Sequence, residues 1–388
     1  MAHFPAPDQP LNPFPSYRTM RDTAPVFQDE QSGSWHVFQY DDVQRVLSEH
    51  ATFSSRMAGD NPSETGQLFA ASLINTDPPR HRQLRSLVTQ AFTLRAVDEL
   101  APRILAITED LLDRISSAGT ADLIGEVAYP LPVIVIAELM GIPAQDRDRF
   151  KHWSDVIVSQ ARPGADTADH GDAHREMAEY FLAMIEHRRS RPGNDLISNL
   201  LAAQIDGQRL DVAELLGFCS LLLVAGNETT TNLIGNAVLC FTEFSGILDR
   251  LVAEPELLPQ AIEEVLRYRS PVQSMYRVAA TNTTLGDKQI PAGSRLVAWI
   301  GSANRDARQF PEPDRFDITR TPNRHLAFGQ GIHFCLGAPL ARLEARLALQ
   351  AVLTRMPGLA LEPGPPLEWM ESTIVHGLKA LPVSWQPA

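Results

Sequence analysis

The stretch from Asp211 to about Phe241 constrains the fold of this 388-residue chain more than any other feature. Asp211 is a favourable N-cap, and a helix over this range would be about 45 Å long at 1.5 Å per residue. Its apolar residues lie on nearly every side, as in Leu215-Leu216-Gly217-Phe218. A helix that is apolar all round is buried instead of half exposed. The sequence therefore predicts a long central helix around which the rest of the chain packs.

Helical periodicity also dominates elsewhere. Apolar residues return every three or four positions in five further segments, whereas strand-like alternation is confined to four short ones. The predicted helices cover 43–47, 96–115, 147–158, 176–185 and 340–353, and the predicted strands cover 33–38, 276–280, 293–299 and 378–385. This pattern predicts a mainly α protein with small β-sheets, in the α+β class. Because no repeat or low-complexity linker divides the chain, residues 1–388 are expected to form a single domain, with 1–15 as a loosely ordered N-terminal segment.

The charge balance and the cysteines bear on partners and compartment. Lys and Arg total 34 against 47 Asp and Glu, and this net charge of −13 argues against nucleic acid or an anionic membrane as the main partner. No basic start followed by an apolar run marks a signal peptide, and the apolar stretches 131–140 and 218–226 are shorter than the roughly 20 residues of a membrane span. Three cysteines make no disulfide framework and favour a reducing compartment. We expect a soluble, cytoplasmic, monomeric protein.

The strongest chemical signal lies just before the last predicted helix, in Phe328-Gly329-Gln330-Gly331-Ile332-His333-Phe334-Cys335-Leu336-Gly337. Its glycines allow turn conformations, and Cys335 precedes a helix N-terminus, where the dipole and free amides stabilise a thiolate. Structural zinc needs four ligands and only His333 lies nearby, while a dinucleotide-binding turn needs a third glycine where Phe334 stands. A single thiolate on iron, with a macrocycle supplying four equatorial ligands, is the economical interpretation. Cys219 and Cys240, inside the long helix, are interpreted as packing residues.

Polar residues interrupt the long helix at Ala225-Gly226-Asn227-Glu228-Thr229. An acid and an alcohol are costly to bury in an apolar helix unless they are satisfied or functional, which makes Glu228 and Thr229 site candidates. The alternative is a threonine that bonds back to the carbonyl of Ala225 and a capped or solvated glutamate. These residues alone leave both interpretations open.

Two further segments pair side chains at helical spacing. Glu264 and Arg267 would share one helix face, although the same spacing occurs at 186–189 and 312–315 and is usual for solvated surface pairs. His81 and Arg85, four residues apart after two prolines, point the same way and can grip one anionic group. An exposed basic helix face is the alternative for this second pair.

These motifs resemble those of the cytochromes P-450, the heme-thiolate monooxygenases. Residues 328–337 match the family's cysteine-loop pattern, Phe-Gly-x-Gly-x-His-x-Cys-x-Gly, at every fixed position, and the other landmarks follow in family order from about Tyr40 to Pro382. The resemblance implies the cytochrome P-450 fold, a triangular helical body around a buried heme b with Cys335 as the axial thiolate. It also implies that Glu228 and Thr229 manage protons for bound dioxygen in a groove of the central helix beside Ala225.

The resemblance assigns supporting roles as well. Glu264 and Arg267 would hold the fold around the heme in a buried network completed by Arg315, which lies just before the cysteine loop. The implied heme contacts are His81, Arg85, Arg277 and His333 at the propionates, Ala225 in the central helix, and Phe328, Gly329 and Gly337 in the loop. The positions that match the family's substrate contacts are Phe69, Leu73, Leu222, Val272, Met275, Ile374 and Val375.

The function that the resemblance implies is the dioxygen-dependent hydroxylation of a hydrophobic small molecule of fatty acid, terpenoid, steroid or macrolide type. As in soluble bacterial members, two electrons would come from a reductase through a separate ferredoxin. An acidic ferredoxin would dock on a basic patch, for which Arg82, Arg342 and Arg346 are candidates despite the net charge. Two alternatives are a peroxygenase that uses hydrogen peroxide and a non-catalytic heme protein that binds hydrophobic ligands. Peroxygenases of this kind lack the acid and alcohol in the central helix, which argues against the first.

Overall fold

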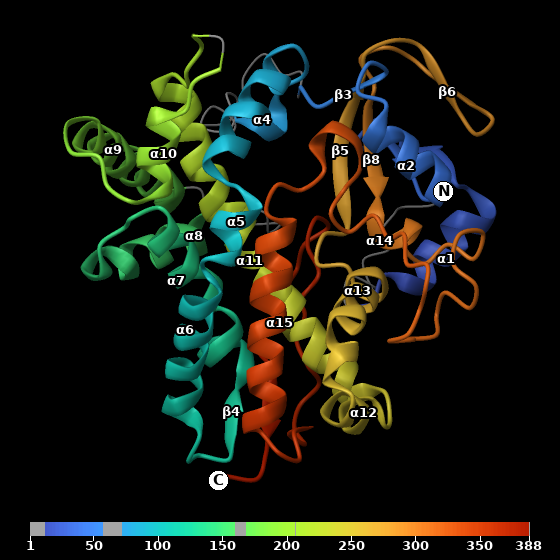
Figure 1. Ribbon diagram of the computed structural model, residues 1–388. Helices are drawn as coiled ribbons and strands as arrows, with labels where there is room; N and C mark the ends of the chain where they lie inside the picture. The colour runs from blue at the N-terminus through green and yellow to red at the C-terminus, as the bar shows by residue number, and fades with distance from the viewer. Residues whose placement is uncertain (1–11, 57–71, 160–167, 206, 388) are drawn as a thin grey trace. The chain divides into compact units, whose positions relative to one another are not determined.

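A computed structural model describes residues 12–56, 72–159, 168–205 and 207–387 of the chain (Figure 1). The chain divides into two compact units. The first comprises residues 1–54, 103–128 and 229–388, and the second comprises residues 55–102 and 129–228. A single domain over residues 1–388 stays a prediction.

The first unit combines helices with three small sheets. Its helices are α1 (Phe14–Thr23), α2 (Tyr40–Ser48), most of α6 (Ala101–Ile115), α12 (Ile247–Ala253), α13 (Leu258–Tyr268), α14 (Ile300–Ala303) and α15 (Ala338–Arg355), with the π-helical turn η2 (Ile124–Ala128) and the 3-10 turns η4 (Pro255–Leu257) and η5 (Gly331–His333). Its strands are β1 (Val26–Gln28), β2 (Trp35–Val37), β3 (Phe53–Ser54), β4 (Thr120–Asp122), β5 (Ser274–Ala279), β6 (Thr283–Leu285), β7 (Lys288–Ile290), β8 (Arg295–Trp299), β9 (Ala360–Leu361) and β10 (Pro382–Ser384). The sheets have the orders β1-β2-β8-β5-β3, β4-β10-β9 and β6-β7.

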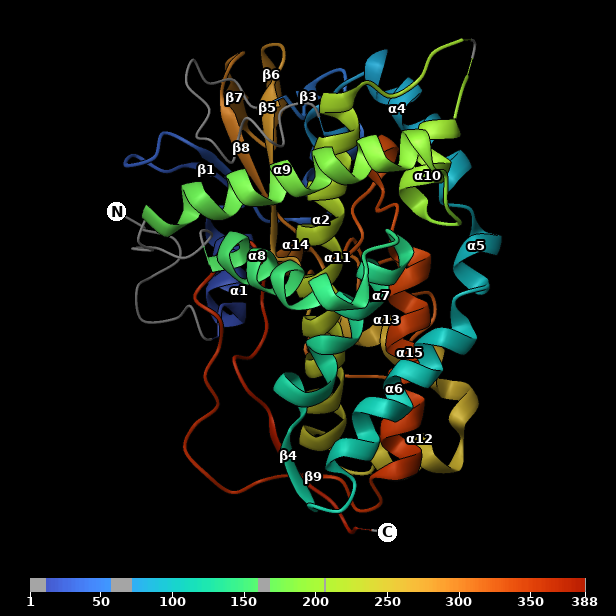
Figure 2. The same cartoon turned by 90° about the vertical axis from the view of Figure 1, so that its left-hand side faces the viewer.

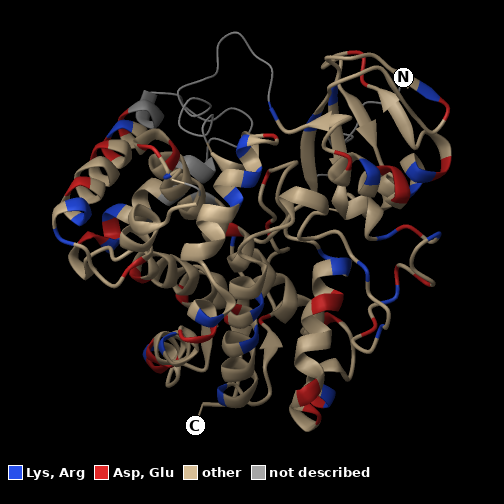
Figure 3. Cartoon of the chain, turned by 45° about the horizontal axis from the view of Figure 1, so that its top comes forward, with Lys and Arg blue, Asp and Glu red and all other residues tan. Residues whose placement is uncertain are grey.

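The second unit is built from helices. They are α4 (Arg80–Ala91), α5 (Leu94–Asp98), α7 (Pro130–Leu139), α8 (Arg147–Ser159), α9 (Ala168–Ser190) and α10 (Leu196–Ala202), with the 3-10 turns η1 (Leu73–Asn75) and η3 (Ala144–Asp146). Helices α8 and α10 both pack against α9 (Figure 2). Basic and acidic residues interleave along the helices of each unit (Figure 3), as expected for solvated faces. The mainly α fold with small sheets that the sequence predicts is confirmed.

The predicted long helix is present as α11 (Val212–Glu243). Asp211 caps it, because its carboxylate accepts from Glu214 N at 2.8 Å, and Glu214 Oε2 in turn accepts from Asp211 N at 3.0 Å. Glu214 also accepts from Arg80 Nε in α4 at 2.7 Å, so one carboxylate joins the starts of α4 and α11. By length and composition α11 could cross a membrane, but the core helix of a soluble protein passes the same test.

The other predicted elements are found with shifted ends. The predicted helix 96–115 is two helices, α5 and α6, because Pro102 stands in the first turn of α6 and cannot donate a backbone hydrogen bond to a preceding helix. The remaining predicted helices correspond to the longer α2, α8, α9 and α15. The predicted strands overlap β2, β5, β8 and β10.

Amphipathic packing in the first unit positions the residues around the cysteine loop. Leu258, Ile262 and Val265 form a buried stripe along α13 at intervals of three and four residues. Helix α13 lies beside α15, and β5 pairs antiparallel with β8 (Figure 1). The strand that follows α13 and the helix that follows the cysteine loop therefore belong to one compact unit.

Candidate active site

The cysteine loop is closed by its own backbone. Cys335 N donates to Phe328 O at 2.8 Å, and Phe334 N donates to Gly331 O at 3.1 Å. Gly329 and Gly331 have φ values of +73° and +72°, in the left-handed region that favours glycine. A Cβ on Gly331 would also lie 2.8 Å from Ser48 Cα in α2. The two glycines therefore fix the turn that presents Cys335.

Replacing Gly331 with alanine should lower the free energy of unfolding by about 2–4 kcal/mol, because two costs add. The left-handed backbone disfavours alanine, and the backbone of Ser48 cannot move aside as a flexible side chain would. Urea unfolding measures the loss. The matched control is Gly293→Ala, because Gly293 has φ +83° and nothing lies within 4 Å of its Cβ position. Equal losses in the two variants would contradict a specific role for the Ser48 contact.

The three cysteines lie in different surroundings. Cys219 and Cys240 are buried in α11, and burial raises the pKa of their thiols to about 12 and about 11, which fits packing residues. Cys335 is exposed, and it lies two residues before Gly337, the N-cap of α15. The Cβ position of Gly337 is 3.9 Å from Cys335 Sγ, an ordinary contact. Cys335 therefore offers an accessible sulfur at the start of a helix.

The donors around Cys335 fit a heme. Within the part of the chain that the structure describes, no cluster of three or more His, Cys, Asp or Glu side chains could hold a metal ion. A structural zinc ion needs four protein ligands, whereas heme iron needs one axial thiolate because the macrocycle supplies the equatorial nitrogens. One exposed thiol in a loop of glycines matches the second requirement.

Glu264 and Arg267 form an ion pair whose side chains are both 0% exposed. Their two contacts measure 2.7 Å and 2.8 Å. Arg267 also donates to three backbone carbonyls, those of Asn304 at 3.0 Å, Pro313 at 2.8 Å and Arg315 at 3.1 Å. Glu264 accepts from Asp317 N at 2.9 Å, Asn323 Nδ2 at 3.1 Å and Arg320 Nε at 3.2 Å. This network ties α13 to the segment that leads into the cysteine loop.

The prediction that Arg315 supplies the third side chain of this network is wrong. Only the backbone oxygen of Arg315 takes part, and its side chain is 63% exposed and pairs with Glu312 at 3.3 Å. Arg320, 10% exposed, provides the second guanidinium to Glu264. A buried carboxylate needs a partner that is buried with it, and the i,i+3 surface pair keeps Arg315 in solvent.

A second network joins α13 to α15. Arg342 binds Glu263 with two hydrogen bonds of 2.7 Å and 2.8 Å, and His325 Nε2 lies 3.0 Å from the same carboxylate. Burial alone would raise the pKa of Glu263, but hydrogen bonds from Arg342 and His325 lower it to about 2. The Arg342 guanidinium carbon lies 4.4 Å from the centre of the Phe328 ring. This network therefore contacts Phe328, the first residue of the cysteine loop. No sequence pattern indicates it.

Four predicted substrate positions lie on two segments of the first unit, 272–275 and 374–375, that are joined by backbone pairing. Val272 forms a β-bridge with Val375, and Gln273 N donates to Ile374 O at 2.7 Å. Val272 and Met275 are partly buried and pack on the core of the five-stranded sheet. The structure therefore brings the C-terminal segment against the start of β5.

The two predicted propionate ligands of the first unit are Arg277 and His333. Arg277 is buried in β5, where its Nη1 donates to Tyr276 O at 2.7 Å. His333 is half-buried in η5, two residues before Cys335.

The second unit carries the other predicted heme and substrate residues. On α4, His81 is buried and Arg85 is half-buried, one helical turn apart as the sequence predicts. Leu73 is buried in η1, and Leu222 is half-buried in α11. Phe69 lies outside the described residues.

The polar segment of α11 contains the boundary between the two units in the sequence, which lies between Glu228 and Thr229. Ala225 is exposed and Glu228 is half-buried in the part that belongs to the second unit. Thr229, also half-buried, is the first residue of α11 in the first unit. Glu228 and Thr229 are consecutive on one helix, which fixes their relative orientation.

Comparison with known proteins identifies the family to which the chain is similar. The cytochrome P450 family model matches residues 148–357. The putative cytochrome P450 YjiB of Bacillus subtilis strain 168 is 43% identical over 378 residues, 96% of this chain and 93% of the relative. The cytochrome P450 monooxygenase PikC of Streptomyces venezuelae is 40% identical over 388 residues, 98% of this chain and 92% of the relative. The substrate-free crystal structure of CYP109E1 from Bacillus megaterium has a TM-score of 0.93 at 44% identity and covers 98% of this chain and 100% of its own.

The chain belongs to the cytochrome P450 family. This confirms the fold class and the resemblance on which the site residues were predicted. The chain is an oxidoreductase of the monooxygenase type, since its relatives are named monooxygenases and hydroxylases. Heme with a cysteine thiolate ligand is the cofactor that the family implies.

Proposed function

We propose that Cys335 binds the iron of heme b and that the chain hydroxylates a hydrophobic small molecule with dioxygen and two electrons. The observation that carries this proposal is an exposed cysteine between a self-bonded glycine loop and the start of α15. Heme, when bound, supplies the activation of dioxygen, which a thiolate ligand assists by favouring O–O cleavage. The reaction places one oxygen atom in a C–H bond and releases the other as water, so it consumes two protons and two electrons.

The residues proposed to hold the heme lie at its propionates and in the cysteine loop. His81, Arg85, Arg277 and His333 would bind its propionates by charge-assisted hydrogen bonds. Phe328, held by Arg342, would shape the thiolate side of the site, with Gly329 and Gly337 leaving room for the macrocycle.

The protons are proposed to pass through α11. Thr229 would hold a proton at its hydroxyl for the dioxygen oxygen that leaves as water, and the Glu228 carboxylate would exchange protons with solvent. Both side chains are half-buried, which suits groups that connect a site to water. Ala225, one turn before Thr229, would leave space for the reactants.

Replacing Thr229 with alanine should uncouple electron use from product formation. Without the hydroxyl, we expect product per reduced nicotinamide consumed to fall about tenfold and hydrogen peroxide release to rise. The measurement compares product, peroxide and cofactor consumption in a reconstituted system with ferredoxin and reductase. Thr242→Ala is the matched control, because Thr242 lies on the same helix and its hydroxyl donates to Val238 O at 2.9 Å.

Unchanged coupling in Thr229→Ala would remove the proton-delivery role. Turnover with hydrogen peroxide but none with dioxygen and reduced ferredoxin would support the peroxygenase alternative. Ligand binding without product from any electron source would support the non-catalytic one.

The proposed substrates are steroid or macrolide in size and apolarity. CYP109E1 from Bacillus megaterium was crystallised with testosterone and with corticosterone, at 45% identity to this chain. The 6-deoxyerythronolide B hydroxylase of Saccharopolyspora erythraea is 38% identical. Val272 and Val375, which form a β-bridge, would contribute apolar contacts to such a substrate. The same role is proposed for Met275, Ile374, Leu73 and Leu222. A spin-state titration against steroids, macrolides, fatty acids and terpenoids, followed by product analysis, tests the substrate class.

A ferredoxin and its reductase are the proposed electron donors, in the cytoplasm. Arg82 and Arg346 are better candidates than Arg342 for the ferredoxin docking patch. The charge of Arg342 is already matched by Glu263, which binds it at 2.7 Å. Residues 1–388 are proposed to act as one catalytic domain.

A further inference from the structure

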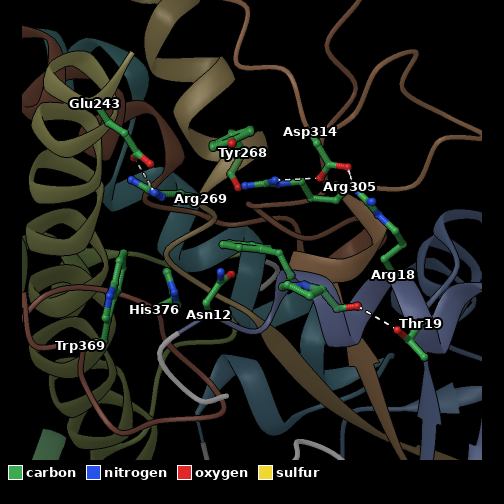
Figure 4. Close-up of a pocket in the computed structure, with 12 residues that line it drawn as sticks. Asn12, Arg18, Thr19, Glu243, Tyr268, Arg269, Arg305, Asp314, Trp369 and His376 are labelled. Carbon is green, nitrogen blue, oxygen red and sulfur yellow. Dashed lines mark hydrogen bonds and ion pairs between the residues drawn. The ribbon is translucent and has the colours of Figure 1, made fainter. Parts of the chain in front are cut away.

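A pocket of about 620 Å³ lies in the first unit (Figure 4). It is lined by α1, by the C-terminal ends of α11 and α13, and by segments around residues 305, 314, 369 and 376. None of the residues proposed above to contact heme, dioxygen or substrate lines it. The volume falls within the range of small-molecule sites.

Arginines line the interior of this pocket, and carboxylates lie nearer to solvent. Arg305 and Arg269 are only 5% and 12% exposed, whereas their partners Asp314 and Glu243 are 40% and 46% exposed. The pairs measure 3.0 Å and 2.7 Å. Arg18 is a third cation and shares Asp314 with Arg305. Because water screens exposed charges more than buried ones, the interior keeps an excess of positive charge.

Two observations indicate that the arginines of this interior lack an anionic partner. Arg269 Nε is buried and has no hydrogen-bond partner among the described residues, which is unfavourable for a donor. Burial, together with the neighbouring cations Arg267 and Arg269, lowers the pKa of Arg305 to about 9. An anionic oxygen inside the pocket would satisfy the first group and stabilise the charge of the second.

Aromatic rings supply flat apolar walls. The Arg305 guanidinium carbon lies 3.4 Å from the centre of the Tyr268 ring and 4.1 Å from that of Phe14. The Trp369 and His376 rings are 4.2 Å apart. In Figure 4, Trp369 lies on the side of the pocket opposite Asp314 and Arg18. A guanidinium that stacks on a ring keeps its N–H groups in its own plane, available to a carboxylate.

We propose that this pocket binds a small aromatic carboxylate, with the carboxylate at Arg269 and Arg305 and the ring against Trp369. A monoanion fits better than a phosphate dianion, since Glu243 and Asp314 add negative charge at the rim. The ring walls favour a flat apolar body over an inorganic ion. The site takes a ligand other than the hydroxylation substrate and does not depend on the proposed chemistry at Cys335.

Calorimetry on the heme-loaded full chain tests the proposal with indole-3-acetate as the probe. Its neutral isostere, indole-3-acetamide, should bind at least tenfold more weakly, and inorganic phosphate should not displace the probe. Arg269→Gln should weaken binding of the carboxylate at least tenfold and leave that of the amide unchanged. The control is Arg45→Gln, a half-buried arginine of the same unit that lies outside the pocket and pairs with Glu49 at 3.0 Å.

Trp369→Ala, a second variant outside the ion pairs, should weaken binding of both the carboxylate and the amide. Circular dichroism of each variant checks that it is folded. Cys335→Ser should bind the probe as the parent does, which separates this site from the proposed function. Equal binding of carboxylate and amide, displacement by phosphate, no binding at millimolar probe, or unchanged binding in Arg269→Gln would overturn the proposal.

Discussion

Replacing Cys335 with serine should abolish hydroxylation and the spectrum of a thiolate-ligated heme. Serine is a poor donor to iron, so the reduced carbon monoxide complex should lose the red-shifted Soret band that a thiolate ligand produces. The backbone bond from residue 335 to Phe328 O does not involve the sulfur, so the loop should keep its shape. Difference spectra and product analysis measure the two losses.

Cys219→Ser is the matched control for this experiment. Cys219 is buried in α11 with a raised thiol pKa, so it should not ligate iron, and its serine variant should keep the red-shifted band. A red-shifted band in Cys335→Ser would show that another residue is the ligand.

Replacing Glu264 with glutamine should lower the free energy of unfolding by about 3–5 kcal/mol. The change removes one negative charge from a site where Arg267 is fully buried and Arg320 is 10% exposed, and both guanidiniums pair with this carboxylate. Their burial would then be uncompensated. Urea unfolding of the heme-loaded protein measures the loss, and heme release should accompany it because the network ends just before the cysteine loop.

Glu312→Gln is the control with the same spacing. Glu312 and Arg315 are also three residues apart, but their side chains are 72% and 63% exposed, so the variant should change stability by less than about 1 kcal/mol. A similar loss in both variants would mean that burial does not decide the strength of these pairs.

Periodic patterns predicted the large elements of the fold and left the small ones undetermined. Helix α11 could be predicted to within a few residues because its capping residue and its apolar sides act locally. Strand β3 is only two residues long, too short to show the alternation of apolar and polar residues that predicts a strand. It is a strand because it pairs with β5. The break between α5 and α6 follows from Pro102, a local signal that the apolar periodicity across it concealed.

In the candidate site too, contacts between neighbouring residues could be predicted and contacts between distant residues could not. The cysteine loop could be predicted because its glycines and Cys335 serve one turn of contiguous residues. The choice between Arg315 and Arg320 could not, since both follow Glu264 by more than fifty residues and only the folded chain shows which guanidinium is buried. The pair of Glu263 and Arg342 and the arginine-lined pocket likewise depend on segments far apart in the sequence.

The contact between Arg80 and Glu214 has a consequence for the order in which the second unit folds. The two residues are 134 positions apart, so their meeting closes a loop that spans most of that unit. Loop-closure entropy disfavours such a contact until the intervening helices have condensed, whereas the cap between Asp211 and Glu214 forms with the helix itself. Glu214 therefore serves an early local contact and a late distant one. We therefore expect its bond to Arg80 to slow unfolding and to have little effect on the rate of folding.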